Sequence, residues 1–341
     1  MQQTEIKRRV ITTKAVRERE SEKKAGAGNI LRPETFDAYI GQAKVKEQVS
    51  LAVRSAAIRE ASAPHMLFYG PPGLGKTTMA HIIASEESVP IKEISGPSIE
   101  KPGDMAAALM GLKPKEIFFI DEIHRIPPAC EEILYSAMED DYLNITIGTG
   151  EQQRTIHVKL PEFTLIGATT RAGMLSAPLR DRFSLKCRME FYTEEELAEI
   201  IKASAVKLEL DITDSQALMA AKASRGTPRI ANSLLERIRD VAVVKNKGTV
   251  TDDTVKEALK IAGTDINGLT VSDMKLLAIL KEADKPVGLM TLSDMTGEDP
   301  GTIEEMQEPY LLKEGYMEKT GRGRLITNKG KAAVSGKPAR K

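Results

Sequence analysis

Three kinds of residue are scarce in this sequence, and each scarcity excludes a class of site. The 341 residues include no tryptophan, seven phenylalanines and seven tyrosines. An aromatic platform that stacks nucleic-acid bases is therefore not the expected mode of binding. The two cysteines, Cys130 and Cys187, lie far apart in the chain, and the four histidines show no metal-ligand spacing. We expect neither a disulfide framework nor a zinc site, which suits a reducing compartment.

Long apolar runs are also missing. No stretch is long enough to span a bilayer, and the N-terminus carries charges where a signal peptide would need an apolar core. We therefore expect a cytoplasmic protein without membrane contact. Apolar residues make up 41% of the chain and charged residues 29%, as in ordinary globular proteins. A chain of 341 residues is long enough for two or three domains.

The formal net charge of zero hides an uneven distribution. Residues 1–24 hold eight Lys/Arg and four Glu, giving +4, and residues 313–341 hold nine Lys/Arg and two Glu, giving +7. The middle must then carry −11, because the three parts sum to zero. Basic ends on an acidic body indicate a polyanionic partner, although a solvated tail is the alternative for the N-terminal part. We expect residues 1–30 to form a flexible charged tail.

The strongest signal lies at residues 66–78. An apolar run leads into a glycine-rich turn, and residues 70–77 read G-x-x-x-x-G-K-T, the spacing of a phosphate-binding P-loop. Glycines such as Gly73 let the backbone approach phosphate, and the helix that follows presents free N–H groups to it. Lys76 is expected to reach the β- and γ-phosphates, and the Thr77 hydroxyl to bind Mg²⁺. A glycine-rich turn without a ligand is the alternative.

A second signal lies at residues 117–122. Four apolar residues predict a strand buried on both faces, and it ends in the carboxylates of Asp121 and Glu122. Open α/β sheets bind ligands at this end of their strands. Asp121 is therefore expected to hold Mg²⁺ through water, and Glu122 to polarise the attacking water. The alternative is a solvated strand end.

Further strands are expected at 90–94, 163–171 and 187–191. The strand over 163–171 ends in Thr169 and Thr170, either of which can hydrogen-bond the γ-phosphate or the attacking water. After it, residues 178–183 predict a helical turn that carries Arg180 and Arg182. An arginine there can stabilise phosphoryl charge in a neighbouring subunit. Alternatively, both arginines pair with surface acids.

Other segments of the first half allow two interpretations each. Residues 45–58 predict an amphipathic helix that packs either on the nucleotide base or simply on the fold. Asp104 is a candidate cap for a helix over 105–110, and a further helix is expected over 129–138. Alternating patterns over 142–150 and 154–160 predict an inserted β-hairpin, which is a lever, a docking surface or structural padding.

From residue 193 onward the patterns are helical. Thr193 and Glu196 form a capping box, and Thr227 with Pro228 begins another helix that carries Arg229 in its first turn. Arg229 can point at a phosphate from the side. With a helix over 251–262, residues 193–263 are expected to form a small helical lid.

The last part predicts a winged-helix domain. Helical patterns cover 272–283, 291–295 and 303–314, and two short strands over 316–319 and 324–327 flank a glycine-containing turn. The wing carries Lys319, Arg322 and Arg324, which are expected to contact DNA phosphates or reach a groove. A solvated basic hairpin is the alternative, but the local charge of +7 favours nucleic acid.

Taken together, these motifs resemble the RuvB family of AAA+ motors over residues 31–329. The likeness rests on Arg32-Pro33 and Ile40-Gly41-Gln42 and on the strings GPPGLGKTT, SGPSIEKPGD, FFIDEIHR, IGATTR, RDRF, RGTPRIAN, EDPGTIEE and KTGRGR. The resemblance implies an ATP hydrolase that uses Mg²⁺ and forms a homohexameric ring on duplex DNA. It also implies branch migration of Holliday junctions in recombination and repair, with RuvA as partner and RuvC in the resolving complex.

The resemblance also implies residue roles. Leu31, Arg32 and Tyr192 would contact the nucleotide, and Gly73, Lys76, Thr77 and Thr78 would bind its phosphates and Mg²⁺. Asp121 and Glu122 would be the Walker B pair, Thr170 the first sensor, Arg182 the arginine finger and Arg229 the second sensor. Glu139, Asp140 and Asp141 would lie near a neighbour's nucleotide, and the hairpin over 142–160 would dock on RuvA. The charged terminal tails and Gly321, where the family pattern has proline, depart from the likeness.

The predicted fold class is α/β: an AAA+ P-loop core with a parallel sheet in the order 5-1-4-3-2, a helical lid and a C-terminal winged-helix domain. The expected boundaries are 31–192, 193–263 and 264–341, with the basic tail in the last. Two rival functions share parts of this pattern. A clamp-loader or initiator AAA+ protein would lack the segment from EDPGTIEE to the wing, and a non-hydrolysing P-loop module would lack the Asp121–Glu122 pair.

Overall fold

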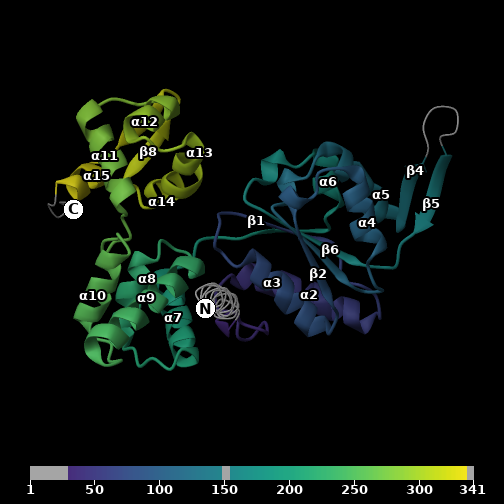
Figure 1. Ribbon diagram of the computed structural model, residues 1–341, viewed down its shortest axis with the longest axis horizontal. Helices are drawn as coiled ribbons and strands as arrows, with labels where there is room; N and C mark the ends of the chain where they lie inside the picture. Colours follow the sequence, from purple (N-terminus) through teal and green to yellow (C-terminus); the bar gives the residue numbers. More distant parts are fainter. Residues whose placement is uncertain (1–29, 148–153, 336–341) are drawn as a thin grey trace, which may run out of the picture.

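The computed structural model describes residues 30–147 and 154–335. The predicted N-terminal tail lies outside these ranges apart from Ile30, as do the turn of the predicted hairpin and residues 336–341. The described chain forms a sheet domain, a helical lid and a winged-helix domain (Figure 1).

The sheet domain contains five parallel strands. They are β1 (Met66–Tyr69), β2 (Ile91–Ser95), β3 (Ile117–Asp121), β6 (Thr164–Thr169) and β7 (Leu185–Arg188), in the spatial order β2-β3-β6-β1-β7. Counting only these five strands, the order is 2-3-4-1-5, which is 5-1-4-3-2 from the other edge, so the predicted order is confirmed. The fifth strand begins earlier than the predicted 187–191, because its pairing with β1 starts at Leu185 opposite Met66.

Helices cover both faces of this sheet, because its central strands are apolar on both sides. Phe119 of β3 packs in a core with α2 (Ala43–Ile58) and α3 (Lys76–Glu87). Its neighbours Phe118 and Ile120 pack in a second core with the helices of the opposite face. Those helices are α4 (Pro102–Met110), α5 (Pro128–Asp140) and α6 (Ala177–Arg182).

The prediction that Asp104 is the N-cap of α4 is wrong by three residues, because the N-cap is Lys101. The helix begins at Pro102, whose fixed φ suits a first helical position. Asp104 therefore lies in the first turn, where its carboxylate accepts the N–H of Lys101 at 3.1 Å. The acid still satisfies the start of the helix, although from inside it.

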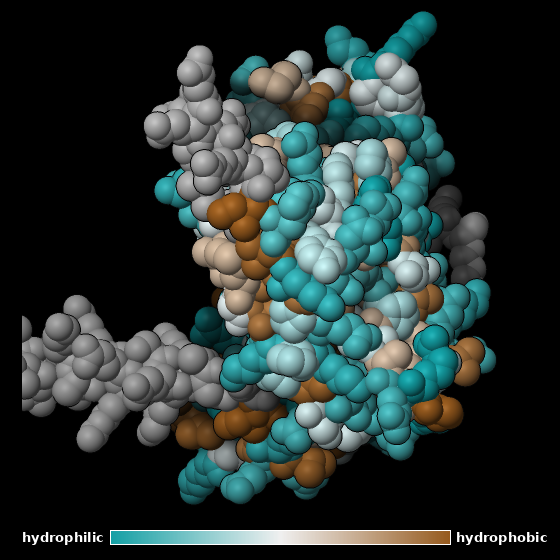
Figure 2. Space-filling model, turned by 90° about the vertical axis from the view of Figure 1, so that its right-hand side faces the viewer, coloured by the Kyte–Doolittle hydropathy of each residue, from teal (hydrophilic) through white to brown (hydrophobic). Residues whose placement is uncertain are grey.

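The predicted hairpin is present and projects from the sheet domain (Figure 1). Strands β4 (Tyr142–Ile147) and β5 (Arg154–Lys159) pair in antiparallel fashion, with Tyr142 opposite Lys159. Figure 2 views the molecule from this side and shows a mostly hydrophilic face with apolar residues in small separate groups. Among the described residues, no helix combines the length and apolar character needed to cross a membrane.

The lid contains four helices: α7 (Glu194–Lys207), α8 (Asp214–Ala223), α9 (Pro228–Asn246) and α10 (Asp252–Ile261). The capping box of Thr193 and Glu196 is confirmed, since each side chain accepts the other's backbone N–H. Thr227 is the N-cap of α9, but its hydroxyl donates to Ser224 O and not to the helix. Helix α8 was not predicted, although Thr213 begins it with the same capping pattern.

The C-terminal domain has its own apolar core and a two-stranded wing, as predicted. Its helices are α11 (Val271–Ala283), α12 (Leu289–Thr296), α13 (Pro300–Thr302), α14 (Glu308–Lys313) and α15 (Asn328–Val334), and its wing pairs β8 (Met317–Thr320) with β9 (Gly323–Ile326). The single helix predicted over 303–314 instead begins with a π-helical turn at Ile303–Gln307, and α14 follows it directly. At the tip, the Thr320 hydroxyl donates to Gly323 O at 2.9 Å, which ties the turn together without proline.

Ion pairs connect the winged-helix domain to the other two. Arg225, which follows α8, pairs at 2.6 Å with Asp273 of α11, whose carboxylate is fully buried. The Arg225 guanidinium also lies over the Tyr310 ring at 4.3 Å. On the other side, Arg171 at the end of β6 pairs with Glu305 of the π-helical turn.

Candidate active site

The P-loop connects β1 to α3 and fixes the position of Lys76. Gly70 and Gly75 have φ values of 142° and 95°, which favour glycine. A Cβ on Gly75 would lie 2.7 Å from the Tyr39 hydroxyl, so the loop also packs too tightly for a side chain there. The Lys76 ammonium donates to Gly70 O and Pro71 O at 2.8 Å each. Its charge therefore sits inside the turn of the loop.

Burial and neighbouring charges act in opposite directions on Lys76. The residue is 7% exposed, and its burial lowers the pKa of Lys76 to about 8, although Glu122 and Asp121 raise it. An ammonium that has lost much of its hydration gains more from an anion than a solvated one does. The site is therefore suited to bind a phosphate group.

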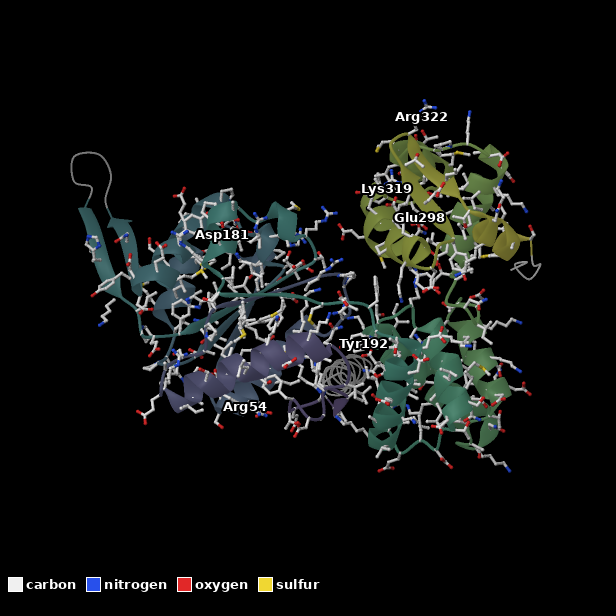
Figure 3. All side chains as sticks on the ribbon, turned by 180° about the vertical axis from the view of Figure 1, so that it is seen from behind. Arg54, Asp181, Tyr192, Glu298, Lys319 and Arg322 are labelled. Atoms are coloured by element: carbon white, nitrogen blue, oxygen red, sulfur yellow. The ribbon has the colours of Figure 1, made fainter. Side chains whose placement is uncertain are left out.

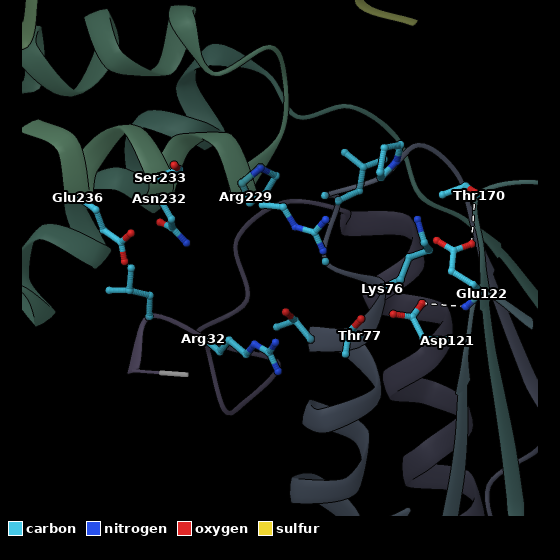
Figure 4. A pocket seen from close by; sticks show the side chains of 17 residues that line it. Arg32, Lys76, Thr77, Asp121, Glu122, Thr170, Arg229, Asn232, Ser233 and Glu236 are labelled. Carbon is cyan, nitrogen blue, oxygen red and sulfur yellow. Dashed lines mark hydrogen bonds between the residues drawn. The ribbon is translucent and has the colours of Figure 1, made fainter. Parts of the chain in front are cut away.

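A cavity of about 410 Å³ opens over this loop, between the sheet domain and the lid (Figure 4). Both domains contribute side chains, and in Figure 4 the Arg229 side chain extends from α9 toward Lys76. Its lining comprises Leu31, Arg32, Pro72, Gly73, Leu74, Gly75, Lys76, Thr77, Thr78, Asp121, Glu122, Thr170, Pro228, Arg229, Asn232, Ser233 and Glu236. The structure thus brings together the predicted phosphate-binding residues, both carboxylates and the predicted lid arginine.

A second cavity of about 350 Å³ continues the first, since Leu31, Arg32 and Thr78 line both. Its walls include apolar side chains such as Ile40 and Ile200. Tyr192 also lines it, with a buried hydroxyl that donates to Leu74 O at 3.3 Å. The cleft therefore has a polar end at the P-loop and a more apolar end between domains, which matches the two ends of a nucleotide.

The carboxylates stand at the end of β3, as predicted. Asp121 Oδ1 accepts the N–H of Glu122 at 3.0 Å. Glu122 has the left-handed backbone conformation, with φ 50° and ψ 45°, and its Oε2 accepts the Thr170 hydroxyl at 3.3 Å. The adjacent Thr169 is fully buried and accepts the Arg171 N–H. Of the two candidate threonines, Thr170 therefore faces the cavity.

The remaining predicted nucleotide contacts lie elsewhere in this chain. Arg182 lies outside the cavity lining and pairs with Glu139 at 2.7 Å, with its guanidinium 4.9 Å from the centre of the Tyr135 ring. Glu139, Asp140 and Asp141 lie outside the lining too. Figure 3 shows Asp181, the neighbour of Arg182 in α6, well away from Tyr192 at the cleft. Within a single chain, Arg182 therefore pairs with an acid, which is the alternative considered from the sequence.

The wing differs from its prediction at Arg324. This residue is 6% exposed, and its guanidinium pairs with Glu308 and with Glu304, the latter at 3.2 Å. Lys319 is half-exposed but pairs with the same two acids. Arg322 is exposed at the tip, at the outer end of the domain (Figure 3). Arg324 therefore does not lie on the exposed surface of the wing, because β9 turns alternate side chains inward.

Sequence reasoning missed four residues of the lid that line the cavity. Pro228 begins α9, and the others lie three, four and seven positions after Arg229: Asn232, Ser233 and Glu236. Those spacings keep side chains on one face of a helix, so helical periodicity from Arg229 was the available signal. His124 was missed as well, although it follows the carboxylates within the same motif.

Comparisons with known proteins agree along the whole described chain. Three family models match in order: "Holliday junction DNA helicase RuvB P-loop domain" over residues 31–189, "RuvB AAA lid domain" over 192–265 and "RuvB C-terminal winged helix domain" over 266–335. The chain is 52% identical over 300 residues to "Holliday junction branch migration complex subunit RuvB" from Campylobacter hominis, covering 88% of each chain. It is 49% identical over 306 residues to the protein of that name from Lactococcus lactis, covering 89% of this chain and 92% of the relative.

Solved structures are similar as well. The "Thermotoga maritima RuvB Holliday junction branch migration motor" aligns with a TM-score of 0.81 and 44% identity, over 90% of this chain and 98% of that one. An alanine-to-serine mutant of a RuvB aligns with a TM-score of 0.82 and 43% identity, over 89% of this chain and 98% of that one. Identities of 43% and 44% over about nine-tenths of the chain indicate membership of the same family and not only a shared fold. The chain therefore belongs to the RuvB family of P-loop ATPases, with an AAA lid and a winged-helix domain.

Proposed function

We propose that the protein is an ATP-driven DNA translocase, which drives branch migration of Holliday junctions together with RuvA in recombination and DNA repair. The observation that carries this proposal is the cavity that joins a P-loop lysine, two carboxylates and a lid arginine. The names of the similar proteins, which specify a branch migration complex, support the DNA substrate.

For hydrolysis, we assign the following roles. Lys76, Thr78 and the glycine backbone around Gly73 hold the phosphates, and Arg229 contacts the γ-phosphate from the lid. Glu122 orients the attacking water, with Thr170 beside it as a polar sensor of the phosphate. The hydrogen bond between Thr170 and Glu122 supports this arrangement.

Mg²⁺ fits the oxygen ligands at this site. Magnesium keeps several waters and takes one or two protein oxygens together with substrate phosphates. Thr77 and Asp121, which both line the cavity, offer a hydroxyl and a carboxylate. They would hold the ion, and the ion would neutralise charge on the phosphates. The described residues contain no cluster of three His, Cys, Asp or Glu, so a metal site made only of protein ligands is not expected here.

The nucleotide base belongs in the more apolar cavity, beside Leu31, Arg32 and Tyr192. A nucleotide that spans both cavities contacts the sheet domain and the lid at once. Its binding would therefore change the angle between them. We further propose that the chain divides into domains at 192/193 and 263/264.

The site is completed by a second copy of the chain in a homohexameric ring. Arg182 lies outside the cavity of its own chain, so we assign it to the neighbour's phosphates, with Glu139, Asp140 and Asp141 beside it. Within its own chain the Arg182 guanidinium pairs with Glu139, so in the ring the neighbour's phosphates would take the place of this acid. Each hydrolysis step would then depend on two subunits.

The DNA and the protein partner use other surfaces. Arg322 at the wing tip, with Lys319 on the same hairpin, contacts the phosphates of duplex DNA. The projecting β4–β5 hairpin docks on RuvA, which the exposed apolar side chains of Tyr142 and Ile156 support. RuvC joins the same assembly in the resolving complex, and the work is done in the cytoplasm.

Two measurements on the wild-type protein test the proposal. Duplex DNA and RuvA should raise its ATPase rate. Imaging with ATP, RuvA and a four-way junction should show a hexameric ring on each of two arms.

Two substitutions test the roles of single residues in hydrolysis. Lys76→Ala should abolish nucleotide binding. Glu122→Gln should keep binding and lower kcat about 100-fold or more, because only the orientation of water is lost. Full turnover by Glu122→Gln would exclude the role given to that residue.

A further inference from the structure

A buried histidine stands directly behind the proposed water-orienting carboxylate. His124 lies in the short turn that follows β3, and its side chain is 8% exposed. Its Nδ1 is 3.2 Å from Glu122 Oε2 and 3.0 Å from the hydroxyl oxygen of Thr169. Glu122 at the end of β3 and Thr169 at the end of β6 therefore both lie close to Nδ1 of His124. His124 itself is not among the residues that line the cavity.

The hydrogen-bonding partners indicate which group carries a proton. An ionised carboxylate only accepts hydrogen bonds, so Nδ1 attracts Glu122 Oε2 only when Nδ1 carries a hydrogen. Thr169 is fully buried and accepts the Arg171 N–H at 2.9 Å, which fixes its hydroxyl oxygen against the ring. Burial lowers the pKa of His124, against the opposing effect of Glu122, which favours a neutral ring with a single N–H. That hydrogen belongs on Nδ1, because a lone pair on Nδ1 would face the Glu122 carboxylate oxygen at 3.2 Å.

The restraints on Glu122 differ in strength. The backbone is fixed, since a Cβ on Gly96 would come within 2.3 Å of Glu122 O and the two segments are therefore in close contact. The carboxylate still rotates about three side-chain bonds. The bond from Thr170 is long at 3.3 Å, beyond the usual range for O–H···O, and Thr170 is partly exposed. The His124 side chain is 8% exposed and hydrogen-bonded to Thr169, so the position of its ring is the more firmly held of the two neighbours of Glu122.

We propose that His124 is a positioning residue for hydrolysis. Its Nδ1–H holds Oε2 of Glu122 from behind, and this leaves Oε1 of the same carboxylate as the oxygen that receives a hydrogen bond from the attacking water. His124 itself touches neither nucleotide nor water. The proposal rests on the ATP hydrolysis proposed above, and it adds a residue that the cavity lining does not contain.

Two substitutions separate the role of the Nδ1–H from that of the ring. His124→Phe keeps the buried ring and removes the donor, whereas His124→Asn returns an N–H donor near the position of Nδ1. His124→Phe should lower kcat by about 10- to 100-fold, since a misplacement on the order of 1 Å costs about that much. The KM for ATP and the Kd for a fluorescent ATP analogue should stay within about twofold of wild type. His124→Asn should restore most of kcat.

The outcomes distinguish the proposals. If wild-type protein shows no ATPase, the proposed function fails. If wild type hydrolyses ATP and His124→Phe retains its kcat, only the inference about His124 fails. A loss of kcat in His124→Phe that His124→Asn does not restore also overturns it, because the donor would then not be the relevant feature.

A measurement on the wild-type protein avoids any effect of substitution on folding. Labelling with ¹⁵N-histidine gives signals from only four histidines, and the His124 signal is identified by its loss in His124→Asn. The nitrogen shifts report directly which ring nitrogen carries the hydrogen. We expect a protonated Nδ1 at neutral pH. A ring protonated at Nε2 alone would place a lone pair against Glu122 and would overturn the proposal.

Discussion

The P-loop cleft and the C-terminal wing both contain basic side chains, but these cations have different partners. In the cleft, Lys76 binds backbone carbonyls of its own loop and remains directed at the cavity. In the wing, Arg324 and Lys319 bind the acids Glu304 and Glu308. The cleft therefore keeps its positive charge for a ligand, whereas the wing uses most of its charge within its own domain.

The two sites also differ in how well the sequence defines the partners of their cations. A P-loop fixes its lysine by glycines and a helix start at set spacings, so the sequence defines the geometry. A basic hairpin is recognised only by counting charges, and a count does not reveal which acids lie opposite after folding. Substitutions at the two sites should therefore have different consequences.

The largest effect is expected at the proposed link between subunits. Arg182→Ala should bind ATP normally but hydrolyse it about 10³–10⁵ times more slowly, as for other arginine fingers. Arg180→Ala, on the same helix, is the matched control and should lose far less. Mixing Arg182→Ala with Lys76→Ala subunits should restore part of the activity. If mixed rings form and remain inactive at every ratio, the cleft is not shared between subunits.

Arg324→Ala should destabilise the winged-helix domain. It leaves Glu308, 3% exposed, with the half-exposed Lys319 at 3.4 Å as its remaining charged partner, and breaking a buried ion pair costs up to about 3–5 kcal/mol. Urea unfolding of the whole chain should show an earlier transition for this domain. Replacing Arg324 and Glu308 together by methionine should recover much of the loss, because no charge is then left buried. A stable Arg324→Ala protein with weakened DNA binding would mean that Arg324 serves DNA after all.

Mild acid should remove the contribution of His65 to the stability of the sheet domain. All four histidines precede residue 158, and His65 accepts the Leu165 N–H at 2.8 Å through Nδ1. Burial lowers the pKa of His65 to about 4 from its ordinary 6.5. Between these values the unfolded chain binds a proton that the folded chain does not, so stability falls as pH falls from 6.5 toward 4. Burial also raises the pKa of Glu87 to about 7, which stabilises the folded chain as pH falls, so the contribution of His65 is measured by comparison with a variant. His65→Asn keeps an acceptor but does not titrate in this range. Calorimetry at pH 7 and pH 5 should show that wild type loses about 1–2 kcal/mol more than His65→Asn over this interval.

Arg322→Ala should have the smallest effect of these substitutions, and that effect should be limited to DNA binding. The exposed tip arginine contributes one phosphate contact, so the slope of log K against log salt should fall by about 0.9 on any duplex sequence. Basal ATPase and urea unfolding should not change. If Arg322→Ala leaves both slope and affinity as in wild type, the wing tip does not hold DNA.

The order of the strands was expected from the family resemblance, since local patterns do not define which strands pair. The polar end of the cleft was predictable from local signals: the glycine spacing and the carboxylates at a strand end. The ion pairs between side chains far apart in the sequence were less predictable. Nothing near Arg324 in the sequence indicates that Glu308 will face it, and the inward side of a four-residue strand cannot be read from so short a pattern. The role of Arg182 depends on a second chain, which a single sequence does not describe.

Glu122 was assigned from its place after β3, but its backbone conformation was not foreseeable. The left-handed φ of 50° has a thermodynamic consequence, because residues with a Cβ lose about 1–2 kcal/mol in that region. The protein would thus trade stability for activity at this one position. Glu122→Gly and Glu122→Ala both remove the carboxylate, yet the glycine variant should be about 1 kcal/mol more stable than the alanine variant. Selection for a stable fold alone would then favour glycine at residue 122, and selection for turnover would oppose it.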